Sequence, residues 1–390
     1  MARLVSALKG TLWVFLFAHL SHHLCTGILV PLLPFIRDHF VLNYFRSGLL
    51  VSVFQLTYGL AQVPMGRIAD RRGKHLLIIL GLAGIALSTL AVGLSDSYYQ
   101  LMAFLVLIGI CGGTYHPSST ALLAERYPQA RRGSVMGIHL VGGASSFIIT
   151  PVLAGLIAQA AGWRGAFMIL SLPALLVSLL FWYKIRDVAA ALGTPSSSKG
   201  STAWDLRGLV RVVGILVSIS VVSHIISAGV VSFLPLYLVD KHGVPPTYAA
   251  MLVGLVHGAG ILGAPSGGAL SDKIGRKPVI MMSVAAAGPL LYLLTVLPFG
   301  PGLLATFVAL GVALTSRTPV MESLLADVVP RERLAGVMGL YFFLSMETSG
   351  ISTPVVGYLM DSLGLNTAFA LLAILAVAAS GLVFLIRSKV

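Results

Sequence analysis

A short charged motif occurs twice in the chain and decides how the rest of the sequence is interpreted. The first copy reads Gly66-Arg67-Ile68-Ala69-Asp70-Arg71-Arg72-Gly73-Lys74. The second copy reads Gly268-Ala269-Leu270-Ser271-Asp272-Lys273-Ile274-Gly275-Arg276-Lys277. Both fit the pattern G-x-x-x-D-[RK]-x-G-[RK], and their aspartates lie 202 residues apart (272 − 70 = 202). Each copy follows a long apolar stretch, so we expect the chain to consist of two similar halves.

The same offset continues far beyond the motif. The pairs that it relates are Gly66 and Gly268, Gly73 and Gly275, Pro117 and Pro319, Pro128 and Pro330, Met136 and Met338, Gly137 and Gly339, Gly155 and Gly357, His22 and His224, and Asp38 and Asp240. A register this constant across several loops indicates an internal duplication. The sequence therefore predicts a six-helix bundle at residues 1–186, a second at residues 209–390, and a Gly-, Ser- and Pro-containing cytoplasmic linker at residues 187–208.

Apolar residues dominate the chain to a degree that excludes a water-soluble protein. Of its 390 residues, 57% are hydrophobic and 10% are charged, whereas soluble domains carry about 25% charged residues. Because about 20 apolar residues span a bilayer, we predict an all-α polytopic membrane protein with twelve transmembrane helices in two six-helix repeats. The predicted spans are residues 11–36, 45–68, 75–95, 98–125, 132–160, 164–184, 210–239, 246–270, 277–298, 300–327, 333–361 and 365–387.

The formal net charge of +13 reports topology rather than a nucleic-acid partner. Most Lys and Arg residues lie in one alternate set of loops, whereas the other set holds Arg37, Arg46, Arg164 and Lys241. By the positive-inside rule, this distribution predicts that both termini are cytoplasmic. Basic loops of this length fit a multi-pass protein of a bacterial inner membrane, and we expect a monomer.

The duplicated motif resembles the signature loop of the major facilitator superfamily, and the resemblance covers essentially the whole chain. It implies two parallel six-helix halves, with the substrate bound at mid-membrane between them. It also implies alternating access, with the motif acting as a conformational latch. The residues assigned to gating are Gly66, Asp70, Arg71, Gly73, Lys74, Gly268, Asp272, Lys273, Gly275 and Arg276.

The residue types of the motif also have physical reasons. Glycine permits a tight turn at Gly73 and Gly275. Glycine at 66 and 268 is expected to let neighbouring helices approach closely. A motif aspartate can accept from a helix N-terminus or pair with an arginine across a bundle.

The first half carries a narrower resemblance. Its motifs are His19-Leu20-Ser21-His22-His23, Tyr115-His116-Pro117-Ser118-Ser119, Val141-Gly142-Gly143-Ala144-Ser145-Ser146, and Thr150-Pro151 with Gly155. Together they resemble the fosmidomycin-resistance branch of the superfamily, whose members are drug exporters. This resemblance implies export of a small solute.

Titratable side chains inside the apolar spans are functional candidates, because a charge at mid-bilayer costs at least about 2.5–3.5 kcal/mol. Three histidines on the first span are spaced i, i+3, i+4 and share one helical face. The residues expected to couple proton movement are Glu347, His22, His23 and His116. The residues expected to bind substrate are Arg317, His19, Gln55, Tyr115, His139, His224, His257 and Glu322. A metal site is an alternative interpretation of the histidines, since imidazoles are metal ligands, but none is predicted because no carboxylate or thiolate accompanies them at ligand spacing.

Arg317 is the one Lys or Arg residue that lies deep inside a predicted span rather than within two residues of its end. A guanidinium keeps its proton in a protein, so it needs an anionic neighbour. That neighbour is expected to be Glu347, Glu322 or a substrate.

No phosphate-binding loop, nucleophile elbow or metal-ligand triad is evident, so the sequence predicts no enzyme and no cofactor, with the proton gradient as the energy source. The partners expected are a small-molecule substrate, protons and the lipid bilayer. The first hypothesis is export of a small amphipathic or drug-like solute by proton antiport. The alternative is symport or exchange of a small organic anion bound by Arg317 and the histidines. A third hypothesis is a transporter-shaped receptor that moves no solute, which the two latch motifs disfavour.

Overall fold

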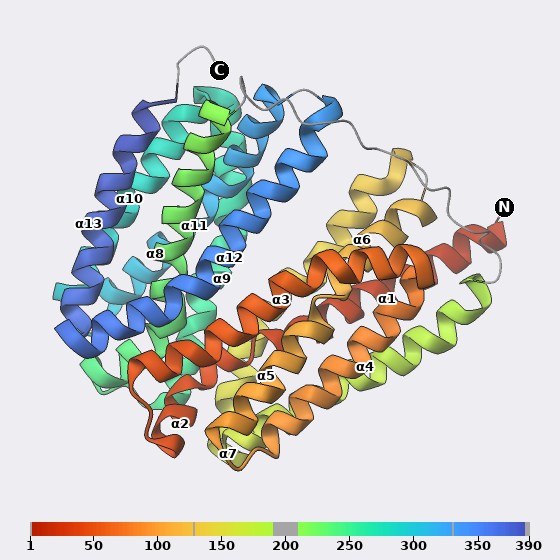
Figure 1. The fold of residues 1–390 in the computed structure, drawn as a ribbon, viewed down its shortest axis with the longest axis horizontal. Coiled ribbons are helices and arrows are strands. Elements are labelled where there is room, and N and C mark those ends of the chain that lie inside the picture. The colour runs from red at the N-terminus through yellow and green to blue at the C-terminus, as the bar shows by residue number, and fades with distance from the viewer. Residues whose placement is uncertain (1, 128, 190–209, 330, 387–390) are drawn as a thin grey trace. The chain divides into compact units, whose positions relative to one another are not determined.

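The computed structural model describes residues 2–127, 129–189, 210–329 and 331–386, and the described residues form helices with short connections and no strand (Figure 1). The helices are α1 (Ala2–Thr26), α2 (Leu29–Phe40), α3 (Tyr44–Arg72), α4 (Lys74–Gly93), α5 (Tyr98–Gly112), α6 (Tyr115–Arg126), α7 (Gln129–Ala189), α8 (Val210–His242), α9 (Pro246–Ile274), α10 (Arg276–Val296), α11 (Pro301–Val328), α12 (Arg331–Leu363) and α13 (Leu365–Phe384). Among the described residues, ten helical segments are long and apolar enough to cross a membrane. The prediction of an all-α membrane protein is therefore confirmed.

In two of the predicted spans, the structure shows a broken helix instead of a continuous one. The helix at the first span stops at Thr26 and resumes at Leu29, and the helix at the fourth span stops at Gly112 and resumes at Tyr115. Proline explains both places, because its ring clashes with the carbonyl group four residues earlier. Pro31 lies four residues after Gly27, and Pro117 lies four residues after Gly113.

A glycine turn interrupts α7. Gly162 has φ 71° and ψ 167°, a backbone conformation that residues with a side chain rarely adopt. This turn lies between the predicted spans 132–160 and 164–184. The helix therefore contains both of these predicted spans.

The chain divides into two compact units. Unit 1 contains the described residues of Met1–Val41, Val53–Lys199 and Pro246–Met251, and unit 2 contains those of Leu42–Ser52, Gly200–Pro245 and Leu252–Val390. The first residues of α3 thus belong to unit 2, and the first residues of α9 belong to unit 1. Most of the predicted linker, residues 190–208, lies outside the described residues, whereas its first three residues end α7.

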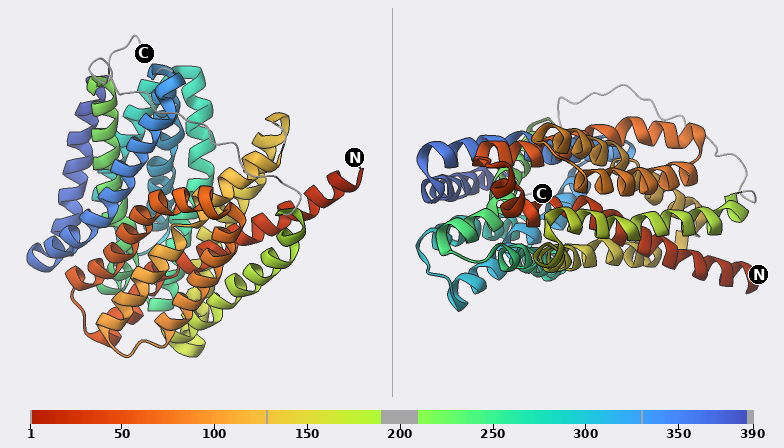
Figure 2. Two further views of the ribbon diagram at one scale, coloured as in Figure 1. Left: turned by 45° about the vertical axis from the view of Figure 1, so that its right-hand side comes forward. Right: turned by 90° about the horizontal axis from the view of Figure 1, so that it is seen from below.

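In unit 1, α7 packs along both α1 and α4, and α4 also contacts α5 and α6 (Figure 2). The core includes Phe15, Leu123 and Phe181, all fully buried. Gly142 brings the α7 backbone close to α1, since a side chain there would collide with the carbonyl group of Leu16. This close approach places the polar residues of α1 next to those of α7.

In unit 2, α10 packs between α13 and α11, and α8 contacts α12 and α13. The core includes Leu216, Ile280 and Leu325, all fully buried. The carboxylate of Asp361, near the end of α12, accepts hydrogen bonds from the backbone N–H groups of Tyr44 and Phe45, at 2.9 and 2.8 Å. It thereby caps the start of α3.

Candidate functional site

Five histidines from three helices meet inside unit 1. His19, His22 and His23 lie on α1, His116 lies at the start of α6, and His139 lies on α7. The ring of His19 stacks on that of His139, with centroids 4.2 Å apart and planes 20° apart. The His116 ring lies 5.1–5.3 Å from the three α1 rings. The structure thus brings together residues that are up to 120 positions apart in the sequence (139 − 19 = 120).

The local structure of three elements creates this histidine cluster. Helical spacing puts the α1 histidines on neighbouring turns. The proline-related break before Tyr115 starts α6 beside them, with His116 as its second residue. Gly143 completes the arrangement, because a side chain at this position on α7 would occupy the place of the His19 ring.

Tyrosines surround His22. Its Nε2 lies 3.2 Å from the hydroxyl oxygen of Tyr58 on α3, and its ring stacks on Tyr115 with centroids 4.7 Å apart. The Tyr115 hydroxyl donates to the carbonyl group of Phe15 at 3.2 Å, so it is already engaged in the protein. Gln55, one turn before Tyr58, has a buried Oε1 without a hydrogen-bond partner. Tyr58 and Gln55 are three residues apart and share one face of α3.

Arg317, on α11 in unit 2, is 4% exposed, and its Nη1 is buried without a hydrogen-bond partner. Within the described ranges, no carboxylate lies at ion-pair distance from it. The two protein partners expected for it, Glu347 and Glu322, therefore do not pair with it. Leaving a buried charge without a counter-charge is unfavourable by several kcal/mol, so this guanidinium requires a compensating anion or polar group from outside the two acids.

A small cavity lies beside Arg317. Its volume is about 10 Å³, which is close to the room that one water molecule requires. Its lining includes the hydroxyl-bearing Ser223 and Ser283, together with apolar side chains of α8, α10 and α11. His224 is close enough to Arg317 for charge interaction, and its Nδ1 lies 2.8 Å from the carbonyl oxygen of Ser220. In this arrangement the cavity has space for water rather than for a solute.

The remaining candidates of unit 2, two acids and a histidine, differ in how far they are buried. Glu347 on α12 is 9% exposed, and its Oε2 is buried without a hydrogen-bond partner. Glu322 on α11 is half-buried. His257 is also half-buried, on α9. Glu347 is thus the more buried of the two acids.

The two copies of the charged motif form matching ion pairs. Lys74 Nζ lies 2.9 Å from Glu125 Oε1. Arg276 Nη1 lies 2.6 Å from Asp272 Oδ1, and its Nε lies 3.5 Å from Asp327 Oδ2. The 202-residue offset carries Lys74 to Arg276 and Glu125 to Asp327. Glu125 and Asp327 were absent from the predicted gating set, and the offset was the signal that would have found them.

The glycines of the motifs fall into two groups. Gly73 and Gly275 have φ 102° and 93°, as expected for a tight glycine turn. The expected close helix approach at the other two is wrong. A side chain at Gly66 would meet Pro117 at an ordinary 3.5 Å, and one at Gly268 would meet nothing within 4 Å. The side chain of Asp70 lies outside what the structure describes, whereas Arg71 and Lys273 are exposed.

This difference predicts opposite effects of one substitution. Gly275→Ala forces a side chain into a backbone region that costs about 1–3 kcal/mol. Gly268→Ala, in the open interior of α9, is expected to be neutral or to stabilise the helix by up to about 1 kcal/mol. Thermal unfolding of the purified variants measures both effects. Equal shifts of the unfolding midpoint in the two variants would contradict the assignment of the turn to Gly275.

Comparisons with known proteins place this architecture in a family. The sequence model of the Major Facilitator Superfamily matches residues 15–300 and 216–390. Multidrug resistance protein MdtG of Yersinia enterocolitica is 24% identical over 362 residues, covering 89% of this chain and 86% of that protein. MdtG of Serratia proteamaculans is 27% identical over 366 residues, with the same coverage of 89% and 86%.

Solved structures share the fold at low sequence identity. A bacterial homologue of the human lysosomal transporter Spinster, inward-facing and unoccupied, has a TM-score of 0.84 at 17% identity and covers 97% of this chain and 96% of its own. A D-xylose-proton symporter has a TM-score of 0.79 at 16% identity, with 97% of each chain covered. These matches confirm the prediction of a multi-pass membrane transporter rather than an enzyme. The chain belongs to the Major Facilitator Superfamily.

Proposed function

We propose that the chain is a proton-coupled secondary active transporter that exports a small amphipathic or drug-like solute by proton antiport. The MdtG relatives, which are named multidrug resistance proteins, support a drug-like solute. The observation that carries proton coupling is Glu347, a buried carboxyl group whose Oε2 has no hydrogen-bond partner. Protonation removes the cost of an unpaired buried charge. A carboxyl group in this setting is therefore suited to alternate between two protonation states during transport.

The proposed topology has twelve crossings with both termini cytoplasmic, in a bacterial inner membrane. Ten segments qualify as spans. One of them, on α7, contains the Gly162 turn and counts as two crossings, which makes eleven. The helix α12 is not among the ten segments and supplies the twelfth crossing. The concentration of basic residues in alternate loops supports the orientation. The six-helix bundles at residues 1–186 and 209–390 follow from the 202-residue repeat.

The proposed gating elements are the two motif turns with their ion pairs, Lys74–Glu125 and Arg276–Asp327. The acidic partners are about half exposed, with 48% and 56% of their side chains accessible, whereas the basic partners Lys74 and Arg276 are 7% and 25% exposed. The Arg276–Asp327 pair is therefore the one that opens and re-forms at the smaller cost, because opening the other pair leaves a mostly buried ammonium group without its carboxylate. A proton gradient is the energy source, with no cofactor, and a monomer is the working unit.

Everted membrane vesicles test the proposal directly. Vesicles containing the protein are energised to an acid lumen, and a pH-sensitive dye reports the gradient while amphipathic cations and neutral amphipathic solutes are added in turn. Antiport predicts that at least one solute dissipates the gradient, and that vesicles without the protein do not respond to it. If no solute produces a response, and small anions instead carry protons into right-side-out vesicles, export by antiport is wrong.

The second candidate function is symport or exchange of a small organic anion. Arg317 favours it, because a buried guanidinium without a carboxylate partner is suited to bind an anionic group. The cavity beside it would have to enlarge from about 10 Å³ to admit more than one water molecule. The two candidates are separated by the sign of the solute charge that produces proton movement.

A further inference from the structure

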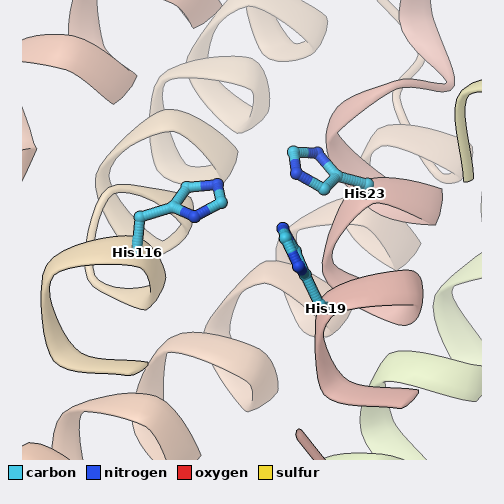
Figure 3. A group of neighbouring side chains, drawn as sticks. All are labelled: His19, His23 and His116. Atoms are coloured by element: carbon cyan, nitrogen blue, oxygen red, sulfur yellow. The ribbon is translucent and has the colours of Figure 1, made fainter. Parts of the chain in front are cut away.

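We propose that His19, His23 and His116 bind a single divalent transition-metal ion of the zinc class, with one coordination position left for a ligand from outside the three histidines. Each residue offers one ring nitrogen, and these nitrogens lie within 4.8 Å of one another. Figure 3 shows the rings of the two α1 residues and the α6 residue turned toward a common space. The proposal does not depend on the direction of transport.

Hydrogen bonds fix the tautomer of both α1 ligands. Nδ1 of His19 lies 2.8 Å from the carbonyl oxygen of His139. A carbonyl oxygen only accepts, so Nδ1 of His19 must carry the hydrogen. Nε2 of the neutral ring then keeps its lone pair. A metal ligand needs such a lone pair, with the other ring nitrogen donating to a second group.

The Thr26 hydroxyl fixes the tautomer of His23. The Thr26 hydroxyl donates to the carbonyl oxygen of His22 at 3.3 Å. Its oxygen is therefore left to accept from Nδ1 of His23, which lies 3.1 Å away. This again leaves the Nε2 lone pair free. Two imidazoles on adjacent turns of one helix are thus oriented as metal ligands usually are.

The spacing of the ligands suits a tetrahedral ion after a small contraction. His19 and His23 are at i and i+4, the spacing at which two histidines of one helix share a zinc ion. Zinc–nitrogen bonds of about 2.0–2.1 Å place tetrahedral ligand atoms about 3.4 Å apart. The nitrogens within 4.8 Å would therefore approach by up to about 1.4 Å (4.8 − 3.4), which side-chain rotation can supply.

The neighbouring histidines are used differently. Nε2 of His22 faces the Tyr58 hydroxyl, and the His139 ring stacks on His19. Neither belongs to the group of converging nitrogens.

Three neutral imidazoles favour zinc, nickel or copper over magnesium and calcium, which prefer oxygen ligands. They also leave the ion's double charge unbalanced in a buried place, so an anionic donor is the favoured fourth ligand. His23 and His116 are half-buried, which leaves a side for its access.

Zinc titration of the purified full-length protein in detergent, with any affinity tag removed, tests the site by calorimetry. We expect one zinc ion per chain and no comparable heat with magnesium. His116→Ala and His23→Ala are each expected to weaken binding at least 100-fold. Thr26→Val preserves the shape but removes the hydroxyl oxygen that accepts from Nδ1 of His23, and is expected to weaken binding about 10–100-fold. His39→Ala, an exposed histidine at the end of α2, is the matched control and should bind zinc like the parent.

Cobalt provides a measurement that needs no variant. Co²⁺ in a site with three imidazoles and one further ligand absorbs visible light strongly, whereas octahedral hydrated Co²⁺ absorbs weakly. A strong spectrum that zinc displaces is the expected result. Weak octahedral absorption would overturn the proposal, as would zinc binding that is unchanged in His116→Ala and His23→Ala. None of these measurements depends on transport, so a failure of proton antiport in vesicles leaves their outcome unaffected.

Discussion

Glu347→Gln is expected to reduce solute-driven dissipation of the proton gradient to the level of vesicles without the protein, while the variant stays folded in the membrane. Glutamine nearly matches the shape of a protonated glutamic acid, so packing around α12 is preserved. It cannot release or bind a proton, however, so it holds the site in one charge state. Because Oε2 of Glu347 has no hydrogen-bond partner, replacing this carboxylate oxygen by the amide group of glutamine breaks no hydrogen bond of Oε2.

The matched control is Asp96→Asn, which also replaces a carboxylate by its amide. Asp96 is exposed in the connection between α4 and α5, and its loss is expected to leave the gradient response intact. Amounts of both variants in the vesicles are compared by immunoblot. A Glu347→Gln variant that still dissipates the gradient at the parental rate would show that another group carries the proton.

Much of the fold could be predicted because it depends on patterns that are local or repeated. Long apolar stretches dictate helices of spanning length, and the 202-residue offset dictates that the halves resemble each other. The breaks at Gly27 and Gly113 were also within reach, since each lies four residues before a proline. The assignment of the first residues of α3 to unit 2, and of the first residues of α9 to unit 1, was not predictable. Contacts between helices that are distant in the sequence decide it.

The site was predictable only within single helices. The spacing of His19 and His23 identifies a shared face of α1, but His116 lies 93 residues after His23 (116 − 23 = 93). Only the fold brings this third imidazole to them, whereas the sequence offered no carboxylate or thiolate at ligand spacing and so predicted no metal site. The same limitation explains Arg317. Two acids were available in the same half, yet sequence spacing gives no distance between α11 and α12, and neither acid pairs with the guanidinium.

The predicted consequence for Arg317 is that replacing it makes the protein more stable. Arg317→Met keeps an apolar chain of similar length and removes a charge that is 4% exposed and without a carboxylate partner. Replacing buried ionic groups by well-packed apolar ones is often neutral or stabilising by about 1–4 kcal/mol. We therefore expect a higher midpoint of thermal unfolding in detergent, measured without added anions.

Arg164→Met is the matched control and should change stability in the opposite direction. Its guanidinium donates to the carbonyl oxygen of Ser95 at 2.7 and 3.2 Å and lies 4.5 Å from the centre of the Trp163 ring. Removing it loses these contacts, so the midpoint should fall. Small organic anions extend the test, because a ligand at 100 times its Kd stabilises the folded state by about 2.7 kcal/mol. If they raise the midpoint of the parent but not of Arg317→Met, the buried charge is kept for anion binding. If Arg317→Met lowers the midpoint as Arg164→Met does, the guanidinium is a structural group, and the anion hypothesis loses the observation on which it rests.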